Sequence, residues 1–260
     1  MSALLSLIKH RQILFSTVLQ GLRKRTSGNV LGALWLLLYP LIFLGMYSLV
    51  FVQILQVRVP GLGTAEYILV VFSGLVPFLA FSEAFGVGTV SIVANRDLLM
   101  NTLFPIELVV AREVFIGHTT MGVGMLLLWG TVLFYHGLNW AHLMVPVIYL
   151  LQIMMVLGLV WISATLTVFF RDLQQAIPIL VLFLMMVSPI GYTADMVPAG
   201  VQGVLLFNPL AWLMELYRSC LMQGVIPLEK LGFFALFSCA LFALGGALIL
   251  RLKPLFADYV

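Results

Sequence analysis

Charged residues are scarce in this chain: Lys, Arg, Asp and Glu make up 9% of its 260 residues, whereas 63% of them are hydrophobic. A soluble domain has roughly 25% charged residues and under half apolar ones, so an ordinary soluble protein is excluded. Aromatic residues, at 12%, are too frequent for a disordered chain. A formal net charge of +3 is too small to suggest a nucleic-acid partner. The composition therefore predicts a protein whose solvent is lipid.

Motifs for nucleotide, metal and nucleophile chemistry are also missing. None of the four lysines lies in the pattern G-x-x-x-x-G-K-[ST], so the chain does not bind ATP through a phosphate-binding loop of that kind. The two cysteines, Cys220 and Cys239, form no C-x-x-C pair, and the four histidines have no metal-ligand spacing. Neither H-E-x-x-H nor G-x-S-x-G occurs. We therefore expect no catalytic residue, metal site, cofactor or enzymatic activity in this chain.

Long charge-free stretches are what the chain has instead. A helix needs about 20 mostly apolar residues to cross a bilayer, and the chain divides into six such segments. The longest stretch, Val114–Phe170, is broken at a polar turn around Gly137. We predict an all-α integral membrane protein with six transmembrane helices, at Leu31–Leu55, Tyr67–Val90, Glu113–Tyr135, Leu143–Phe170, Leu173–Tyr192 and Leu231–Leu250.

The basic residues predict how these helices face. Ten of the 13 Lys and Arg side chains fall in the N-terminal segment, in the loops after the second and fourth predicted helices, and near the C-terminus. The other three are Arg58, Arg218 and Lys230. Because Lys and Arg accumulate on the cytoplasmic side, both termini are predicted to be cytoplasmic.

Residues 1–25 do not read as a secretory signal, because Lys9, His10 and Arg11 interrupt the apolar stretch. We predict an amphipathic helix lying in the cytoplasmic membrane interface, with its basic residues toward the lipid headgroups. The alternative is a frayed start of the first transmembrane helix. The apolar residues that would share one face are Leu4, Ile8, Phe15, Leu19 and Leu22.

The segment 191–227 is rich in proline and glycine. Its apolar pieces, Val201–Phe207 and Leu210–Leu221, are each too short to cross a membrane. We predict a re-entrant helical hairpin that enters from the outer face and breaks at Asn208–Pro209. Irregular backbone at membrane depth has to be buried in protein or line a water-filled cavity, so such a hairpin would lie beside a pathway. The alternative is a loop lying flat on the outer surface.

Few charges fall inside the predicted helices. Glu83 is the one acid near the middle of a transmembrane helix, and intramembrane charges are functional candidates. It could carry a proton, or it could be a buried hydrogen-bonding group that fixes helix packing. Glu215 and Arg218, three residues apart, would share one face of a re-entrant helix and could neutralise each other.

Short motifs, in order along the chain, resemble those of a known family. The first predicted transmembrane helix opens with Arg-x5-Leu-Gly-x-x-Trp-x4-Pro, and the second contains Gly-Leu-Val-Pro-Phe. The ordered set is similar to type 2 ATP-binding-cassette permeases that export polysaccharides, and it covers about residues 10–255. Its residues are Arg25, Leu31, Gly32, Trp35, Pro40, Phe72–Phe78, Asn95, Phe104, Pro105, Phe169–Asp172, Ser188–Ile190, Tyr192, Pro198, Asn208 and Pro209.

The resemblance implies a single permease domain over residues 1–260, acting as a homodimer in the bacterial inner (cytoplasmic) membrane. ATP and Mg would be held by a separate nucleotide-binding ATPase subunit. The cargo would be a lipid-linked polysaccharide, a capsular polysaccharide or an O-antigen, exported from the cytoplasm. A capsule system would also imply a periplasmic or outer-membrane export partner.

Three sets of site residues are expected under this resemblance. The charged cytoplasmic loop 94–113, which is long enough for a short coupling helix, would contact the ATPase through Arg96, Asp97, Glu107 and Arg112. A lipid phosphate or an acidic sugar would be bound by Arg23, Lys24 and Arg25, whose alternative role is topology alone. The substrate channel would be lined by Trp35, Tyr39, Phe43, Glu83, Tyr217 and Arg218.

Other functions stay open at this point. A type 2 permease could carry a lipid or a drug, and an ATP-independent secondary transporter could use Glu83. A secondary transporter of that kind would be expected to show repeated halves with matching broken helices, whereas only the segment 191–227 is broken here. A membrane transferase would need clustered acids for a metal and a phosphate, which the predicted helices lack.

Overall fold

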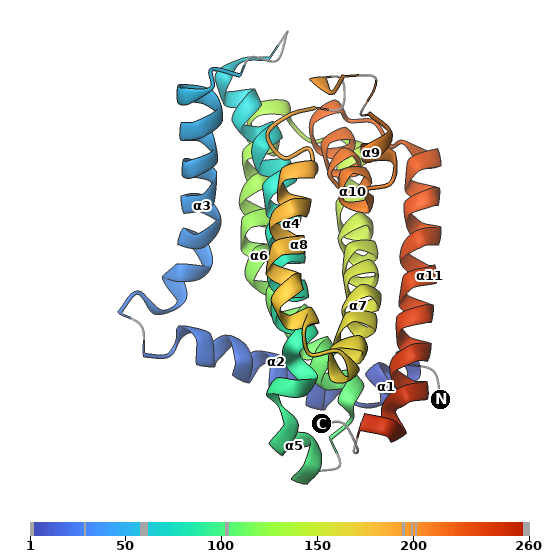
Figure 1. Ribbon diagram of the computed structural model, residues 1–260. Coiled ribbons are helices and arrows are strands. Elements are labelled where there is room, and N and C mark those ends of the chain that lie inside the picture. Colours follow the sequence, from blue (N-terminus) through green and yellow to red (C-terminus); the bar gives the residue numbers. More distant parts are fainter. Residues whose placement is uncertain are drawn as a thin grey trace.

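The computed structural model describes residues 3–28, 30–57, 62–101, 104–193, 196–198, 200 and 202–256, and over these ranges every regular element is a helix. Long helices run side by side, with α1, α2 and α5 at one end and α9 and α10 at the other (Figure 1). We call these the α5 end and the α10 end. The elements are α1 (Ala3–Lys9), α2 (Arg11–Thr26), η1 (Gly32–Leu34), α3 (Trp35–Ser48), η2 (Leu49–Ile54), α4 (Thr64–Ala94), α5 (Arg96–Asn101), α6 (Ile106–His136), η3 (Trp140–Met144), α7 (Val145–Phe169), α8 (Leu173–Val187), α9 (Gln202–Leu206), α10 (Pro209–Arg218), η6 (Ser219–Gln223), α11 (Leu228–Leu252) and η7 (Lys253–Leu255).

The core is built around α4. Most of its side chains are buried, because it packs against α6, α7, α8 and α10. The helix continues through Pro77 near its middle, although proline has no N–H to donate to the helix. The side-chain amide of Gln152 on α7 donates to the carbonyl of Pro77 at 2.9 Å, which ties α7 to α4 at this point.

Close packing of α7 against α11 depends on small residues. A Cβ on Gly158 would lie 2.6 Å from the backbone nitrogen of Phe242. A Cβ on Gly245 of α11 would lie 2.9 Å from Cα of Gly158, so each glycine faces the other helix's backbone. Small residues at this seam let two helix backbones approach in the way that is common between membrane helices.

Five described segments are long and apolar enough to cross a membrane, and they overlap the first, second, third, fourth and sixth predicted helices. The predicted fifth helix, 173–192, corresponds to α8, an apolar helix of 15 residues. At 1.5 Å per residue, α8 is about 22 Å long. It ends at Val187 because Pro189 disfavours a helical conformation at Ser188, which is extended. The five segments are Gly32–Ile54, Thr64–Ala94, Ile106–His136, Trp140–Phe169 and Leu228–Leu255.

The predicted loop 94–113 is mostly helical. α5 follows α4 directly, and α6 begins at Ile106 after Pro105. Glu107 and Arg112 therefore belong to α6 and not to a loop. Their charges suggest a loop in the sequence, whereas in the folded chain they have partners on other elements, which is why a helix can contain them.

The N-terminal segment forms two helices, α1 and α2, which meet at His10. α2 crosses the foot of α6 at the α5 end (Figure 1). Side chains of the predicted apolar face remain uncovered: Ile8 is 53% exposed and Phe15 is 70% exposed. This is the exposure that an interfacial helix would have.

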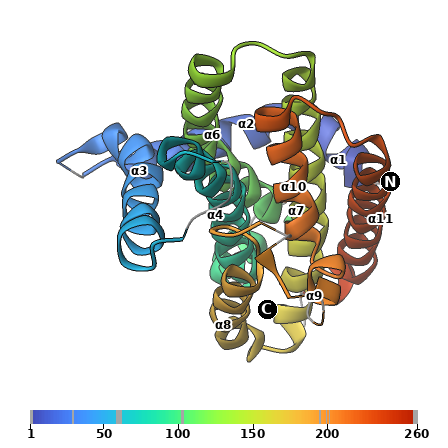
Figure 2. The same ribbon diagram turned by 90° about the horizontal axis from the view of Figure 1, so that it is seen from above.

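Two helices leave much of their surface uncovered. α3 stands at the edge of the molecule beside α4 and α6, away from α7 and α11 (Figures 1 and 2). Its Pro40 packs toward Gly124 of α6, where a Cβ on the glycine would lie 3.2 Å from Cβ of Pro40. α8 is also uncovered on one side, with Ile179 and Met186 exposed.

The predicted segment 191–227 contains α9, α10 and η6, and it has the predicted break at Asn208–Pro209. Val201, at the start of its first apolar piece, lies outside the described residues. Arg58, one of the three Lys and Arg residues predicted to lie away from the cytoplasmic side, also lies outside them. The Asn208 side chain accepts a hydrogen bond from the Leu210 amide at 3.0 Å, and Pro209 occupies the first turn of α10. α10 packs against α4, α7 and α11, so this short helix is buried in the α10 end of the bundle.

Candidate functional site

Arg25 lies at the end of α2, where α2 meets α4 and α6. Its guanidinium forms an ion pair with Glu83 of α4, and another of its nitrogens lies 4.0 Å from a carboxylate oxygen of Glu113 on α6. The Arg25 side chain is 34% exposed and that of Glu83 is 18% exposed. Burial lowers the pKa of Arg25, while the charge of Glu113 acts in the opposite direction. The predicted intramembrane acid is thus paired with a cation from another helix.

Arg112 completes this group of charges. Its Nε donates to Oε1 of Glu113 at 2.8 Å, and its Nη2 donates to Oδ1 of Asn95 at 3.3 Å. Asn95 follows α4 and donates its side-chain amide to a backbone carbonyl in the last turn of that helix at 2.7 Å. The charges thus connect the ends of α2, α4 and α6. We call Arg25, Glu83, Asn95, Arg112 and Glu113 the Arg25 cluster.

A polar cavity of about 460 Å³ lies beside the cluster, between α2 and α6. Three cationic side chains line it, those of Lys24, Arg25 and Arg112, together with one carboxylate, that of Glu113. Arg23, in the same turn of α2, is exposed. Guanidinium and ammonium groups form strong charge-assisted hydrogen bonds to phosphate and carboxylate groups. The arrangement is therefore suited to holding an anion.

The residues predicted to contact an ATPase lie in different surroundings. Arg96 and Asp97 are exposed on α5. Arg112 is directed into the Arg25 cluster, and Glu107 is only 2% exposed. Two of the four side chains are therefore placed on the surface of the α5 end, and the other two are used inside the chain.

Glu107 joins both ends of the chain to α6. Its carboxylate accepts hydrogen bonds from Oγ of Ser6 at 2.5 Å and from Nζ of Lys253 at 3.1 Å. Its backbone carbonyl accepts from the indole nitrogen of Trp161 at 3.2 Å. These contacts hold α1, η7 and α7 around the first turn of α6.

The three aromatic residues predicted for the channel follow one face of α3. Trp35 is 42% exposed and Tyr39 is 39% exposed, while Phe43 is half-buried. The rings of Tyr39 and Phe43 lie 5.0 Å apart, tilted by 47°. The face is thus an aromatic surface that the rest of the described chain leaves partly uncovered.

Arg218, at the end of α10, is buried and binds mostly backbone. Its guanidinium approaches α4 at Gly74, where a Cβ would lie 2.9 Å from Nη2. Four of its five acceptors are carbonyl oxygens, so the side chain joins the last turn of α10 to α4 and to the segment after α8. The acceptors are Oγ of Ser73 at 3.3 Å and the carbonyls of Val70 at 3.2 Å, Pro189 at 2.5 Å, Ile190 at 2.9 Å and Tyr192 at 3.1 Å.

Tyr217 is fully buried next to Arg218. Its hydroxyl donates to Oε1 of Gln152 at 3.0 Å, and the same amide group donates to Pro77. A chain of hydrogen bonds therefore runs from α10 through α7 to the proline of α4. In the single chain, the Tyr217 ring is packed in the protein interior.

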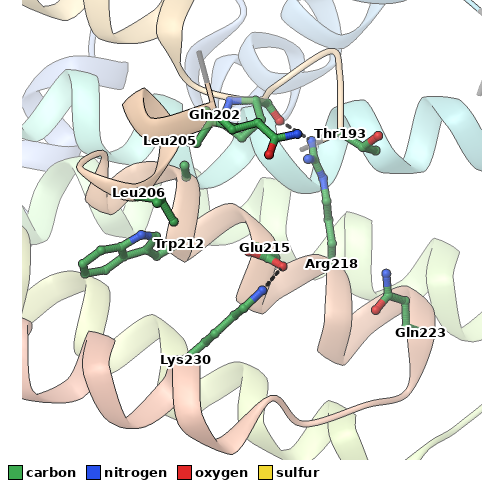
Figure 3. A pocket seen from close by; sticks show the side chains of 11 residues that line it. Thr193, Gln202, Leu205, Leu206, Trp212, Glu215, Arg218, Gln223 and Lys230 are labelled. Atoms are coloured by element: carbon green, nitrogen blue, oxygen red, sulfur yellow. Dashed lines mark hydrogen bonds and ion pairs between the residues drawn. The ribbon is translucent and has the colours of Figure 1, made fainter. Parts of the chain in front are cut away.

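A second cavity, of about 400 Å³, lies at the α10 end (Figure 3). Glu215 pairs there with Lys230 of α11, and not with Arg218 as the spacing suggests. The cavity is lined by the Trp212 ring, the side-chain amides of Gln202 and Gln223, the ion pair and part of Arg218. The side chains labelled in Figure 3 are Thr193, Gln202, Leu205, Leu206, Trp212, Glu215, Arg218, Gln223 and Lys230.

The structure separates the predicted channel residues and adds others. Glu83 lies at the Arg25 cluster, whereas Tyr217 and Arg218 lie at the α10 end. Sequence reasoning missed Gln152, although a single amide inside an apolar helix signals a buried hydrogen-bonding role. It also missed the pairing of Lys230, for which no short-range pattern exists. Within the described part of the chain, no group of three or more His, Cys, Asp or Glu side chains could hold a metal ion.

Related proteins have export or transport roles in their names. The chain is 27% identical over 245 residues to the O-antigen export system permease protein RfbA of Klebsiella pneumoniae, and the aligned region covers 92% of this chain and 91% of that protein. It is 27% identical over 225 residues to the RfbA protein of Myxococcus xanthus, covering 85% and 84% of the two chains. It is 28% identical over 239 residues to the polysialic acid transport protein KpsM of Escherichia coli, covering 88% and 89%.

A family match covers most of the chain. The family model described as ABC-2 type transporter matches residues 13–222, which run from α2 through α10 and include the Arg25 cluster, Tyr217 and Arg218. The apolar helices agree with a protein that crosses the membrane several times. This chain therefore belongs to the ABC-2 type transporter family of membrane transport proteins.

Proposed function

We propose that this chain is the membrane-spanning subunit of an ATP-driven exporter, which moves a lipid-linked polysaccharide from the cytoplasm across the bacterial inner membrane. Capsular polysaccharide and O-antigen are the two cargo classes, because relatives along nearly the whole chain are named for O-antigen export and for polysialic acid transport. A separate subunit hydrolyses ATP, since the sequence has no phosphate-binding loop. A capsule cargo would add a periplasmic export partner.

In this proposal the membrane contains six spans, and α8 is the fifth. The α5 end faces the cytoplasm together with both termini, as the distribution of Lys and Arg favours. α1 and α2 lie in the cytoplasmic interface with Ile8 and Phe15 toward lipid. α9 and α10 enter the bundle from the outer face and return to it, which makes the cavity at the α10 end an outward-facing one.

The observation that carries the proposal is the uncovered aromatic face of α3. Large apolar side chains are exposed along α3 and along α8, as expected for surfaces that contact lipid or another membrane subunit. A second copy of the chain would cover part of these faces, and a path for sugars would run between the copies. Trp35, Tyr39 and Phe43 would then line it, because aromatic rings stack on sugars without fixing them.

Residues at the α5 end and at the α10 end would supply the other steps of transport. Arg23, Lys24 and Arg25 would bind the lipid phosphate or an acidic sugar at the cytoplasmic side, with Arg112 as a further cation. Tyr217 and Arg218 would hold the outer segment in place at the exit. Arg96 and Asp97 would contact the ATPase from α5, while Glu107 and Arg112 would position α6 behind that surface.

A secondary transporter that uses Glu83 as a proton carrier is less consistent with the structure. The Glu83 carboxylate is paired with Arg25 in a partly exposed place at the end of α2. The pair joins α2 to α4, which assigns the carboxylate to helix packing.

Co-purification of an ATPase subunit with this chain tests the exporter proposal. The tagged chain, purified in mild detergent, is expected to bring a soluble ATPase with it in equal proportion. Charge reversal by Arg96→Glu should release that subunit, because the exposed cation is removed from the contact surface. Arg251→Glu, the same reversal on α11 at the same end, is the control and should not. Purification of the chain alone, with transport that needs no ATP, would contradict the proposal.

A further inference from the structure

The Arg25 cluster has two cations and two carboxylates, and Lys24, which lines the cavity beside it, adds a cation that the cluster does not balance. Arg25 is shared between Glu83 and Glu113, and Glu113 also binds Arg112. Lys24 points into the same cavity, and in the part of the chain that the structure describes it forms no ion pair. The cavity therefore has a net positive lining that an added anion can neutralise.

Arg25 belongs to the ion pair and to the cavity at once. Its guanidinium reaches Glu83 on α4, and the same side chain lines the space between α2 and α6. Both side chains of the pair are partly exposed, so the pair is weak enough to be exchanged. A phosphate offers two oxygens to the planar guanidinium fork and can also accept from the Lys24 ammonium.

Breaking this pair would loosen the corner between α2 and α3. Gly28 and Gly32 both adopt the left-handed backbone region there, with φ of +84° and +47°. Neither glycine would meet a neighbour closer than 3.9 Å if it carried a Cβ, so the corner is open around both. The Arg25–Glu83 pair is an ionic link from the last turn of α2 to α4, immediately before this corner.

We propose that the Arg25 cluster is an anion-exchange site, in which a phosphate group on the cargo replaces the Glu83 carboxylate on Arg25 and thereby releases the end of α2 from α4. The ligand class is a phosphodiester or a diphosphate diester, because a phosphate that links a lipid to a sugar is bonded to both. The proposal rests on the proposed function, which supplies the phosphate-bearing cargo. It gives Glu83 the role of a competitor that holds Arg25 until cargo arrives.

Binding of two probes to the full chain in detergent micelles tests the exchange. The probes are inorganic pyrophosphate, which carries the phosphates alone, and farnesyl diphosphate, which carries them on a hydrocarbon chain. Glu83→Gln is expected to bind more tightly than wild type by roughly five- to tenfold, because a competing partner of Arg25 is removed. Arg25→Gln should weaken binding by a similar factor, and Glu83→Gln should bring no gain in the Arg25→Gln background.

Two further variants keep this result interpretable. Glu229→Gln removes an exposed carboxylate in the first turn of α11 and should leave binding unchanged, since it lies outside the cluster. Glu113→Gln should move affinity in the same direction as Glu83→Gln, which preserves the test if one variant folds poorly. A gain with both probes assigns recognition to the phosphates, and a gain with farnesyl diphosphate alone assigns it to a lipid-borne phosphate; either supports the exchange.

A distance measurement tests the release itself. Spin labels on Ser27→Cys and Ala94→Cys, in a Cys239→Ser background, report the separation of α2 from the end of α4. Saturating farnesyl diphosphate, which carries both the phosphates and a hydrocarbon chain, should lengthen this distance in wild type, and Glu83→Gln should show the longer distance without ligand.

The outcomes separate this proposal from the one before it. If Glu83→Gln binds no tighter than wild type, or the label distance does not respond, the exchange is wrong. The phosphate site would still stand if Arg25→Gln weakens binding. If no variant binds either probe, the exchange and the phosphate site are both wrong, while co-purification of an ATPase still decides the exporter function.

Discussion

Arg218 illustrates how a buried charge is accommodated at the scale of a residue. α8 ends at Val187, and the buried backbone that follows it has carbonyl oxygens that no helix supplies with donors. The guanidinium donates to the carbonyls of Pro189 and Ile190 in this segment, and a buried guanidinium is tolerable only when it is hydrogen-bonded. The residue that the sequence suggests as a channel cation thus also holds the segment after α8 against α4.

Gly74 is predicted to be essential to this arrangement. Gly74→Ala would place a Cβ 2.9 Å from Nη2 of Arg218 and 3.1 Å from Cα of Ile190. We expect a loss of about 1–3 kcal/mol of stability, measured as a lower melting temperature in detergent. Gly86→Ala on the same helix meets nothing within 4 Å and should be neutral or stabilising. Equal melting temperatures for the two variants would contradict the assignment.

At the scale of elements, helix contacts explain which sequence predictions succeeded. The apolar stretches predicted five long helices to within about ten residues at each end, because burial in lipid or protein requires continuous apolar sequence. The start of α6 was misplaced because Glu107 finds Ser6 and Lys253, about a hundred residues or more away in the chain. No local pattern reports a partner at that separation.

The seam between α7 and α11 provides the prediction at this scale. Gly158→Ala would push its Cβ into the backbone of Leu241 and Phe242, which cannot move aside as a side chain can. We expect a loss of stability at least as large as that for Gly74→Ala, read from thermal unfolding in detergent. Gly232→Ala, on the open side of α11, is the matched change and should leave the unfolding temperature in place.

At the scale of the whole molecule, the single chain leaves an apolar edge without a partner. Much of α3 is exposed, and the sequence predicted its aromatic face but not its isolation from the bundle. The pairing of Arg25 with Glu83 was also out of reach, since the two residues are 58 positions apart and lie on different helices. Placement of both features depends on how the helices pack, which a single sequence does not record.

Cross-linking tests whether a second copy covers this edge. Leu49 is 55% exposed at the end of α3, and Leu49→Cys in a Cys239→Ser background should form a disulfide-linked dimer in membranes. Leu138 is 82% exposed between α6 and α7. The variant Leu138→Cys should stay monomeric under the same oxidation. Dimers from Leu138→Cys but not from Leu49→Cys would show that the copies meet elsewhere.

The contact of Glu107 with Ser6 and Lys253 has a consequence for the order in which the chain is completed. Ser6 is synthesised before Glu107, and Lys253 emerges from the ribosome 247 residues after Ser6. The carboxylate at the start of α6 therefore has to wait for its second donor until Lys253 has been made. During biogenesis, this contact at the α5 end closes only after all the helices from α1 to α11 have been synthesised.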